Sequence, residues 1–103
     1  MDISKSDSIR YRQEVKQGVD IFQKSFKEAA ETKDFPEKKD LFDKSAKEAM
    51  QAIGDAAKAL MNKEILAQKE KLEKDYNDYQ RDPSAENSKK IAEDIKSFKN
   101  ILE

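Results

Sequence analysis

Two prolines divide this chain into three stretches, and they constrain its fold more than any other feature. Pro36 and Pro83 are the only prolines in 103 residues, and a proline inside a helix removes a hydrogen bond and clashes with the preceding turn. Within each stretch the apolar residues recur at the three- and four-residue spacing of an α-helix. The sequence therefore predicts an all-α protein with helices over about residues 8–32, 36–80 and 84–102.

The apolar residues of the first and last stretches each fit one helical face. Their separations are four, four, three and four residues in the first stretch, and four, three and four in the last. The positions are Tyr11, Val15, Val19, Phe22 and Phe26, then Ile91, Ile95, Phe98 and Leu102.

The expected helix starts carry residues that suit N-terminal positions. Asp7 or Ser8 can cap the first helix. Asp34 lies three residues before Glu37, as in a capping box. Asp82 directly precedes the second proline, which we expect to be the first residue of the last helix. Because the connections are short, neighbouring helices should pack as antiparallel hairpins.

The middle stretch changes its apolar face halfway along. Its first and second halves form arcs rotated by roughly 110°, and the arcs meet over residues 59–67. We expect one long central helix that is shared by two antiparallel hairpins, one with each flanking helix. The alternative is a break near Asn62, which would give a compact four-helix bundle. No glycine or proline lies at that point, which favours the continuous helix.

The length suits a single domain, residues 1–103, with the polar residues 1–7 as a flexible N-terminus. Both glycines, Gly18 and Gly54, fall inside predicted helices. The hairpin register places Gly18 opposite about residue 50, one turn from Gly54. Close approach of the two helices explains this pattern, and a kink at Gly54 is the alternative.

The composition also favours a thin helical assembly. Charged residues make up 42% and hydrophobic residues 36%. This composition suits helices that each bury one apolar stripe and leave most of their surface exposed to solvent. A rod two helices thick buries little core. We therefore expect self-association to a homodimer with coiled-coil-like packing, most simply about a two-fold axis near residues 60–67.

The residue types for catalysis and for ligand binding are sparse. The chain has no histidine and no cysteine, which are the common proton carrier at neutral pH and the thiolate ligand of zinc sites. The carboxylates alternate with lysines on polar faces, for example Asp43 with Lys47 four residues later. We expect a non-enzymatic protein with no catalytic residue, no metal, no cofactor and no small-molecule substrate.

The remaining function class is protein–protein interaction, as a small adaptor, chaperone-like protein, inhibitor or assembly component. Docking would place apolar anchors of helix faces against a protein partner. The residues expected to mediate self-association are Leu60, Met61, Ile65 and Leu66, and those expected to contact a second partner are Ile9, Ile21, Tyr76 and Tyr79.

The alternative function is regulatory binding to nucleic acid or to a membrane surface through the lysines of the last helix. Lys89, Lys90, Lys96 and Lys99 are interrupted by acidic residues, and the formal net charge is −1, so a one-sided basic face is not expected. The N-terminal residues lack the apolar core of a signal peptide. We expect a cytoplasmic protein, with export without a leader as the alternative.

Overall fold

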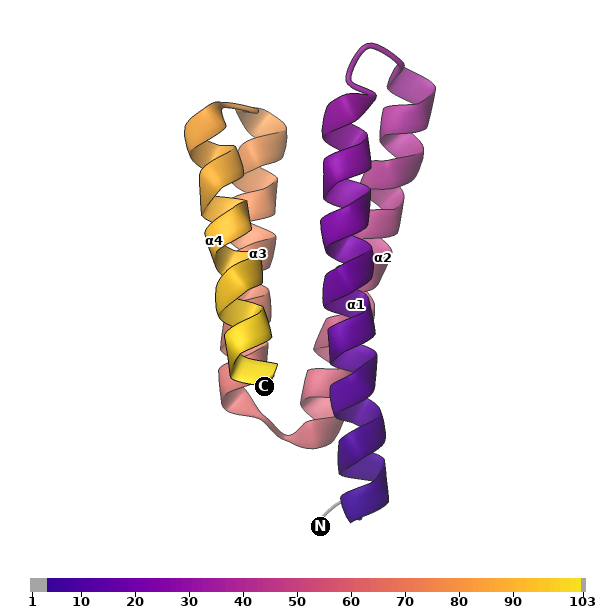
Figure 1. Ribbon diagram of the computed structural model, residues 1–103, viewed down its shortest axis with the longest axis vertical. Helices are drawn as coiled ribbons and strands as arrows, with labels where there is room; N and C mark the ends of the chain where they lie inside the picture. The colour runs from indigo at the N-terminus through magenta and orange to yellow at the C-terminus, as the bar shows by residue number, and fades with distance from the viewer. Residues whose placement is uncertain (1–3, 103) are drawn as a thin grey trace.

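Residues 4–102, the part of the chain that the computed structural model describes, form four α-helices. In chain order they are α1 (Lys5–Glu31), α2 (Pro36–Leu60), α3 (Lys63–Arg81) and α4 (Ala85–Leu102). α1 and α2 form one antiparallel hairpin, and α3 and α4 form a shorter hairpin beside it (Figure 1). The described bundle measures 47 × 24 × 19 Å. The all-α prediction is confirmed.

The predicted continuous helix over residues 36–80 is wrong, because the chain turns at Met61 and Asn62. Met61 adopts the left-handed conformation, with φ of 55°. Its N–H donates to the carbonyl of Lys58 at 3.0 Å, and the N–H of Asn62 donates to the carbonyl of Ala57 at 3.2 Å. These are the two bonds of a Schellman motif, which ends a helix. The alternative break near Asn62 is therefore the observed arrangement.

Asn62 also begins the next helix, since its side-chain oxygen accepts a hydrogen bond from the N–H of Ile65 at 3.0 Å. The break lets both apolar arcs of residues 36–80 face one core, in which Ile53, Ile65 and Leu72 are fully buried. A left-handed non-glycine residue costs roughly 1–2 kcal/mol, whereas burying one large aliphatic side chain contributes about 1.5–3 kcal/mol. Burial therefore outweighs the strained turn.

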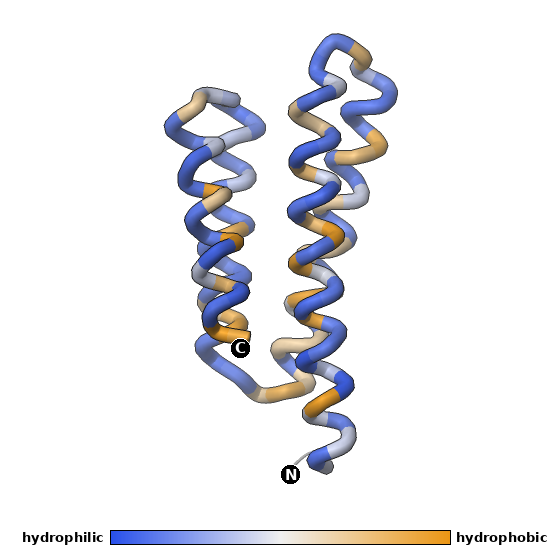
Figure 2. The backbone as a smooth tube through the Cα atoms, viewed as in Figure 1, coloured by the Kyte–Doolittle hydropathy of each residue, from blue (hydrophilic) through white to orange (hydrophobic). Residues whose placement is uncertain are grey.

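The core runs along the centre of the bundle, where hydrophobic positions of all four helices face inward (Figure 2). The fully or nearly fully buried apolar residues are Val15, Val19, Phe22, Ala29, Ala46, Ala49, Met50, Ile53, Ala56, Ala57, Ile65, Leu72, Tyr76, Ile91, Ile95, Phe98 and Leu102. Seven of the nine predicted stripe residues of the first and last helices thus lie in the core, and the other two, Tyr11 and Phe26, are half-buried and pack against it.

The start of α1 differs from the prediction. The helix begins at Lys5, because the hydroxyl of Ser4 accepts a hydrogen bond from the N–H of Asp7 at 3.1 Å. Asp7 and Ser8 therefore lie within the first turn and do not cap it. Of the predicted flexible segment 1–7, residues 4–7 are a cap and a helical turn, and residues 1–3 lie outside the described part.

Two other predicted caps are wrong as well. Phe35, not Asp34, directly precedes α2, and among the described residues no side chain caps that end. At α4 the hydroxyl of Ser84 accepts from the N–H of Asn87 at 3.1 Å, so Ser84 takes the capping position and Asp82 instead ends α3. Pro36 is the first residue of α2, whereas the prediction that Pro83 begins the last helix is wrong, because α4 begins at Ala85.

Close helix approach at Gly18 is confirmed. A Cβ atom at Gly18 would lie 2.6 Å from Cγ1 of Ile53, a fully buried side chain on α2. At Gly54 a Cβ would lie 3.2 Å from Cε of Lys69 on α3, the end of a flexible side chain. α2 continues through Gly54 to Leu60, so this glycine does not divide the helix.

The two glycines give a matched pair of substitutions. Gly18→Ala should lower the free energy of unfolding by about 1–2 kcal/mol, because overpacking against Ile53 exceeds the gain in helix propensity. Gly54→Ala should leave it unchanged or raise it by up to about 1 kcal/mol, since Lys69 can move aside. Urea denaturation measures both, and equal effects of the two substitutions would contradict the assigned close contact.

The turn at Met61 gives a substitution whose sign depends on the fold. Met61 is 73% exposed, so its removal loses little packing. Met61→Gly should raise the free energy of unfolding by about 1 kcal/mol, because glycine adopts the left-handed conformation without strain. In a continuous helix the same change would lower it by about 1 kcal/mol. Met61→Ala is the control for loss of the side chain, and chemical denaturation gives the three values.

Candidate functional site

A pocket of about 380 Å³ lies between the two hairpins, at the end of the bundle that carries both the α1–α2 turn and the α3–α4 turn (Figure 1). We call it the loop-end pocket. It is formed by the end of α1, the first turns of α2 and the end of α3, together with the following turn. Its lining residues are Ala29, Ala30, Lys33, Lys39, Asp43, Tyr79, Gln80 and Pro83.

Aromatic side chains from both hairpins form the apolar wall behind the pocket. The rings of Phe22 and Tyr76 meet edge to face with centroids 5.3 Å apart, and those of Phe26 and Tyr79 do so at 5.0 Å. Such pairs contribute about 0.5–1.5 kcal/mol beyond the burial of their area. Phe22 and Tyr76 are buried, whereas Phe26 and Tyr79 are half-buried. Of these four rings, that of Tyr79 lines the pocket, so its exposed part is the aromatic surface that the pocket offers to a ligand.

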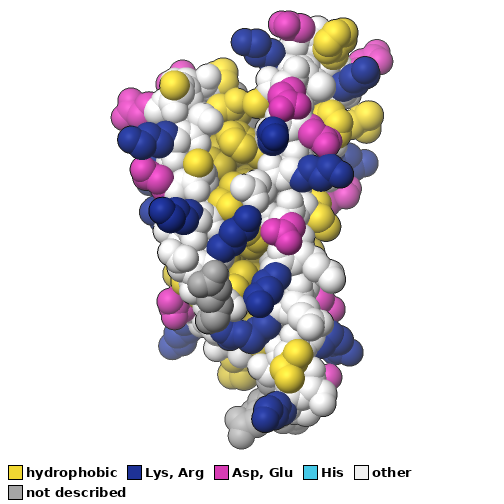
Figure 3. Space-filling model, viewed as in Figure 1, with side chains coloured by type: hydrophobic (Ala, Val, Ile, Leu, Met, Phe, Trp, Pro, Cys, Tyr) yellow, Lys and Arg dark blue, Asp and Glu magenta, His cyan; other side chains and the backbone are white. Residues whose placement is uncertain are grey.

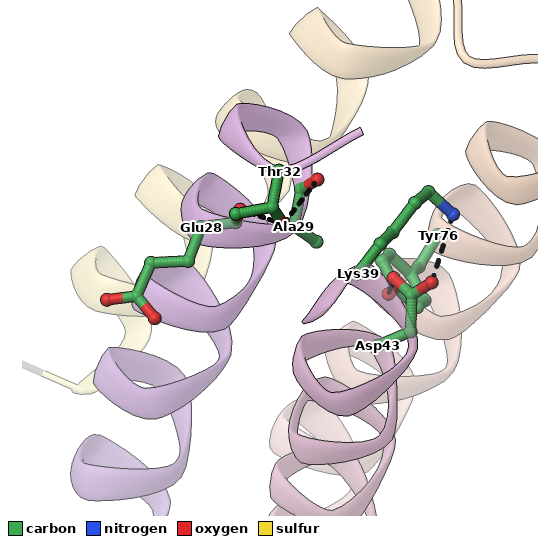
Figure 4. Close-up of polar contacts among 6 residues, drawn as sticks. All are labelled: Glu28, Ala29, Thr32, Lys39, Asp43 and Tyr76. Atoms are coloured by element: carbon green, nitrogen blue, oxygen red, sulfur yellow. Dashed lines mark hydrogen bonds and ion pairs between the residues drawn. The ribbon is translucent and has the colours of Figure 1, made fainter. Parts of the chain in front are cut away.

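The carboxylate of Asp43 lies at the α2 side of the pocket and is held by two neighbouring side chains. The Tyr76 hydroxyl donates to Oδ1 of Asp43 at 2.6 Å, and Nζ of Lys39 lies 3.1 Å from Oδ2 of the same carboxylate (Figure 4). Burial and the negative charge of Asp43 raise the pKa of Tyr76, so its hydroxyl stays protonated. Both oxygens of Asp43 are thus engaged within the molecule.

Thr32 caps the C-terminal end of α1 in the same region. The Thr32 hydroxyl donates to the carbonyl of Glu28 at 2.8 Å and pairs more weakly with that of Ala29 at 3.4 Å (Figure 4). Lys33, the next residue, is exposed and forms no ion pair with any residue of the range 4–102. The pocket therefore offers one lysine free for an anionic group.

The seam between α1 and α4 continues from the pocket toward the other end of the bundle. Hydrophobic side chains gather along it, and lysine or arginine side chains cross its lower half (Figure 3). Nζ of Lys99 on α4 lies 2.8 Å from Oε1 of Gln23 and 3.9 Å from Oδ1 of Asp20, both on α1. These contacts join the hairpins near the C-terminal end of α4 and leave the loop end open.

The structure separates the eight predicted interaction residues. Tyr79 lines the loop-end pocket, and Tyr76 is buried behind it. The residues Leu60, Met61, Ile65 and Leu66 lie at the opposite end of the bundle, around the α2–α3 turn.

Burial further divides these residues. Ile65 is fully buried, and Tyr76 nearly so, and both serve the core of this structure rather than its surface. Leu60 and Leu66 are half-buried and pack against the core. Met61 is exposed, as are Ile9 (52%) and Ile21 (51%) on α1. Ile21 lines a separate shallow pocket beside Gly18, on the α1–α2 hairpin.

Sequence reasoning missed Lys33, Lys39 and Asp43 as members of one site. We expected Asp43 to pair with Lys47 on a solvated face, but its partner is Lys39, four residues before it. Spacing on one helix could not distinguish the two lysines. The distinguishing contact is the Tyr76 hydroxyl, which arrives from another helix.

A second polar feature lies between α3 and α4, where Asp94 is 1% exposed. Nζ of Lys71 lies 3.1 Å from its Oδ1, and Nε2 of Gln68 donates to its backbone carbonyl at 3.0 Å. Its Oδ2 has no hydrogen-bond partner within residues 4–102. Burial and the neighbouring Asp75 carboxyl raise the pKa of Asp94 to about 6, and Lys71 opposes the shift.

The described residues hold no cluster of three or more acidic side chains suited to a metal ion.

The Asp94 carboxyl makes stability depend on pH. The pKa of Asp94 is about 6 in the folded chain against an ordinary value of 3.8, so the folded state binds the extra proton. Stability from this group is therefore present below pH 4 and is lost as the pH rises through 6. Between pH 4 and pH 7, the free energy of unfolding of the unsubstituted chain should therefore fall by about 2–3 kcal/mol relative to that of the Asp94→Asn variant.

Chemical denaturation at several pH values measures this difference, and Asp40→Asn, an exposed aspartate on α2, is the matched control. Parallel pH profiles for Asp94→Asn and the unsubstituted chain would contradict the assignment.

Comparison with known proteins found no matching family model, no matching curated protein and no matching solved structure. None of the helices over residues 4–102 combines the length and the apolar character needed to cross a membrane.

Proposed function

We propose that this protein is a non-catalytic helical module that binds a segment of another protein at the seam between its two hairpins. The observation that carries the proposal is the half-buried pair Phe26 and Tyr79 beside the loop-end pocket. Partly exposed aromatic rings at a concave site are typical anchors of protein interfaces. An amphipathic helix that lays its apolar face in a groove is a common partner for such a site.

The charges around the seam favour a partner with acidic flanks. Lys33 lines the pocket and Lys16 lines the seam further down, and neither forms an ion pair within residues 4–102. Lys39 and Lys99 line the same surfaces but already contact Asp43 and Asp20. Asp20 lies among them, but it already contacts Lys99 at 3.9 Å. Rim charges of this kind chiefly set the orientation and the association rate of a partner.

Self-association is a second proposal, carried by Met61 alone. The break at Met61 removes the argument from a thin rod, because the second hairpin folds back on the first. Met61 nevertheless remains 73% exposed, with the half-buried Leu60 and Leu66 nearby in sequence. If these residues hold two copies together, Met61→Ser should reduce the average mass in light scattering on a sizing column.

Binding to nucleic acid or to a membrane surface through α4 has less support. Lys89 and Lys90 are exposed, but Lys99 contacts Gln23 and Asp20 on α1. Fewer lysines of α4 are therefore available for phosphates than the sequence suggests. Affinity for DNA that falls steeply with salt would favour this alternative.

A library of displayed amphipathic helical peptides tests the main proposal. We expect selection on the full chain to enrich peptides that carry apolar anchors and acidic flanks. Ala30→Glu, which adds bulk and negative charge at the pocket, should weaken the selected peptides by about tenfold or more. Ala52→Glu, a second exposed alanine on the outer side of the α1–α2 hairpin, should leave their affinity unchanged.

Two results would overturn the proposal. One is a selection that enriches no peptide above the unselected library. The other is equal binding by the chain with Ala30→Glu and the chain with Ala52→Glu, since binding would then lie outside the seam. Circular dichroism of both variants checks that each keeps its helix content.

A further inference from the structure

We infer that the loop-end pocket recognises an apolar group that carries a carboxylate, as the terminal anchor of the bound segment. This inference rests on the proposed function and names the chemistry that the partner would present. The volume of about 380 Å³ lies at the small end of the range for ligand sites, roughly 300–1,000 Å³. It suits one large side chain with its own carboxylate rather than several residues.

The apolar half of the ligand is matched by the pocket walls. Ala29 and Ala30 present small side chains at the end of α1, and Pro83 and the Tyr79 ring face them from the other hairpin. The Tyr79 ring is held in place by its edge-to-face contact with Phe26 at 5.0 Å. An apolar group placed here would lie against side chains that are already ordered, which lowers the entropy lost on binding.

The charged half of the ligand is matched by Lys33. Asp43 is the acidic residue in the pocket lining, and its two oxygens already accept from Tyr76 and pair with Lys39. Lys39 is thereby largely neutralised, while Lys33 has no ionic partner among residues 4–102. Gln80 adds a carboxamide group to the same lining. The local balance therefore favours a single negative charge beside the apolar wall.

Three small probes separate the two halves of this chemistry: N-acetylphenylalanine, its neutral amide, and acetate. The full ¹⁵N-labelled chain would be titrated with each and followed by NMR. We expect N-acetylphenylalanine to shift the amide signals of Ala29, Ala30, Tyr79 and Gln80. The neutral amide and acetate should bind about fivefold more weakly or worse, because each lacks one of the two contacts.

Lys33→Gln should reduce the affinity for N-acetylphenylalanine to that for the neutral amide. Lys27→Gln, an exposed lysine on α1 outside the pocket lining, is the matched control and should have no effect. Equal affinity for the acid and its amide, no effect of Lys33→Gln, or shifts confined to another surface would each overturn the inference.

The outcome also separates this inference from the proposed function. Helical peptides that bind without any binding of N-acetylphenylalanine would retain the protein-binding proposal and overturn the carboxylate inference. If N-acetylphenylalanine binds at the pocket while no displayed peptide is selected, the carboxylate chemistry stands and the protein-binding proposal fails. The ligand would then be a free apolar acid rather than a segment of a protein.

Discussion

The left-handed backbone at Met61 is the constraint on which the rest of this structure depends. It ends α2 and reverses the chain, so that the second hairpin lies along the first. A straight helix through this point would carry Tyr76 and Tyr79 away from α1. The aromatic contacts with Phe22 and Phe26 would then be lost, and the loop-end pocket would lose one of its walls.

The contacts between the two hairpins differ in kind along the length of the bundle. Near the turns, aromatic rings meet edge to face, and the Tyr76 hydroxyl reaches Asp43 on α2. Toward the end of α4, Lys99 reaches across to α1. Between them the buried aliphatic side chains fill the centre. The pocket exists because the hairpin ends diverge beyond the aromatic cluster and no described side chain fills the space between them.

Periodicity predicted the helical class and most of the core. The stripes of the first and last helices required no knowledge of their partners, because a repeat of three and four residues already defines the buried face. The close helix contact at Gly18 could also be predicted from the sequence, since a glycine inside a helical pattern indicates close approach when the register places it opposite another helix. These features are local or depend on one hairpin.

The failures have a different origin. Methionine has no preference for the left-handed conformation that Met61 adopts. The free energy that offsets this conformation comes from the burial of Ile65 and Leu72 elsewhere in the fold. The burial of Asp94 on α4 could not be predicted either, because it depends on packing against α3, from which Lys71 contacts its carboxylate. The pocket residues come from three helices and two turns, so no single stretch of sequence reveals them. Tertiary packing decides each of these cases.

The order of contacts along the chain has a consequence for how the molecule moves. α1 pairs with α2 and α3 pairs with α4 through short turns, so each hairpin closes a short loop and belongs to a class of low contact order that folds quickly. The bond from Lys99 to Gln23 spans 76 residues and forms after the hairpins meet. The helices also pack more extensively within each hairpin than between the hairpins. The seam should therefore open at a lower free energy than either hairpin unfolds, as a sub-global opening visible in amide hydrogen exchange.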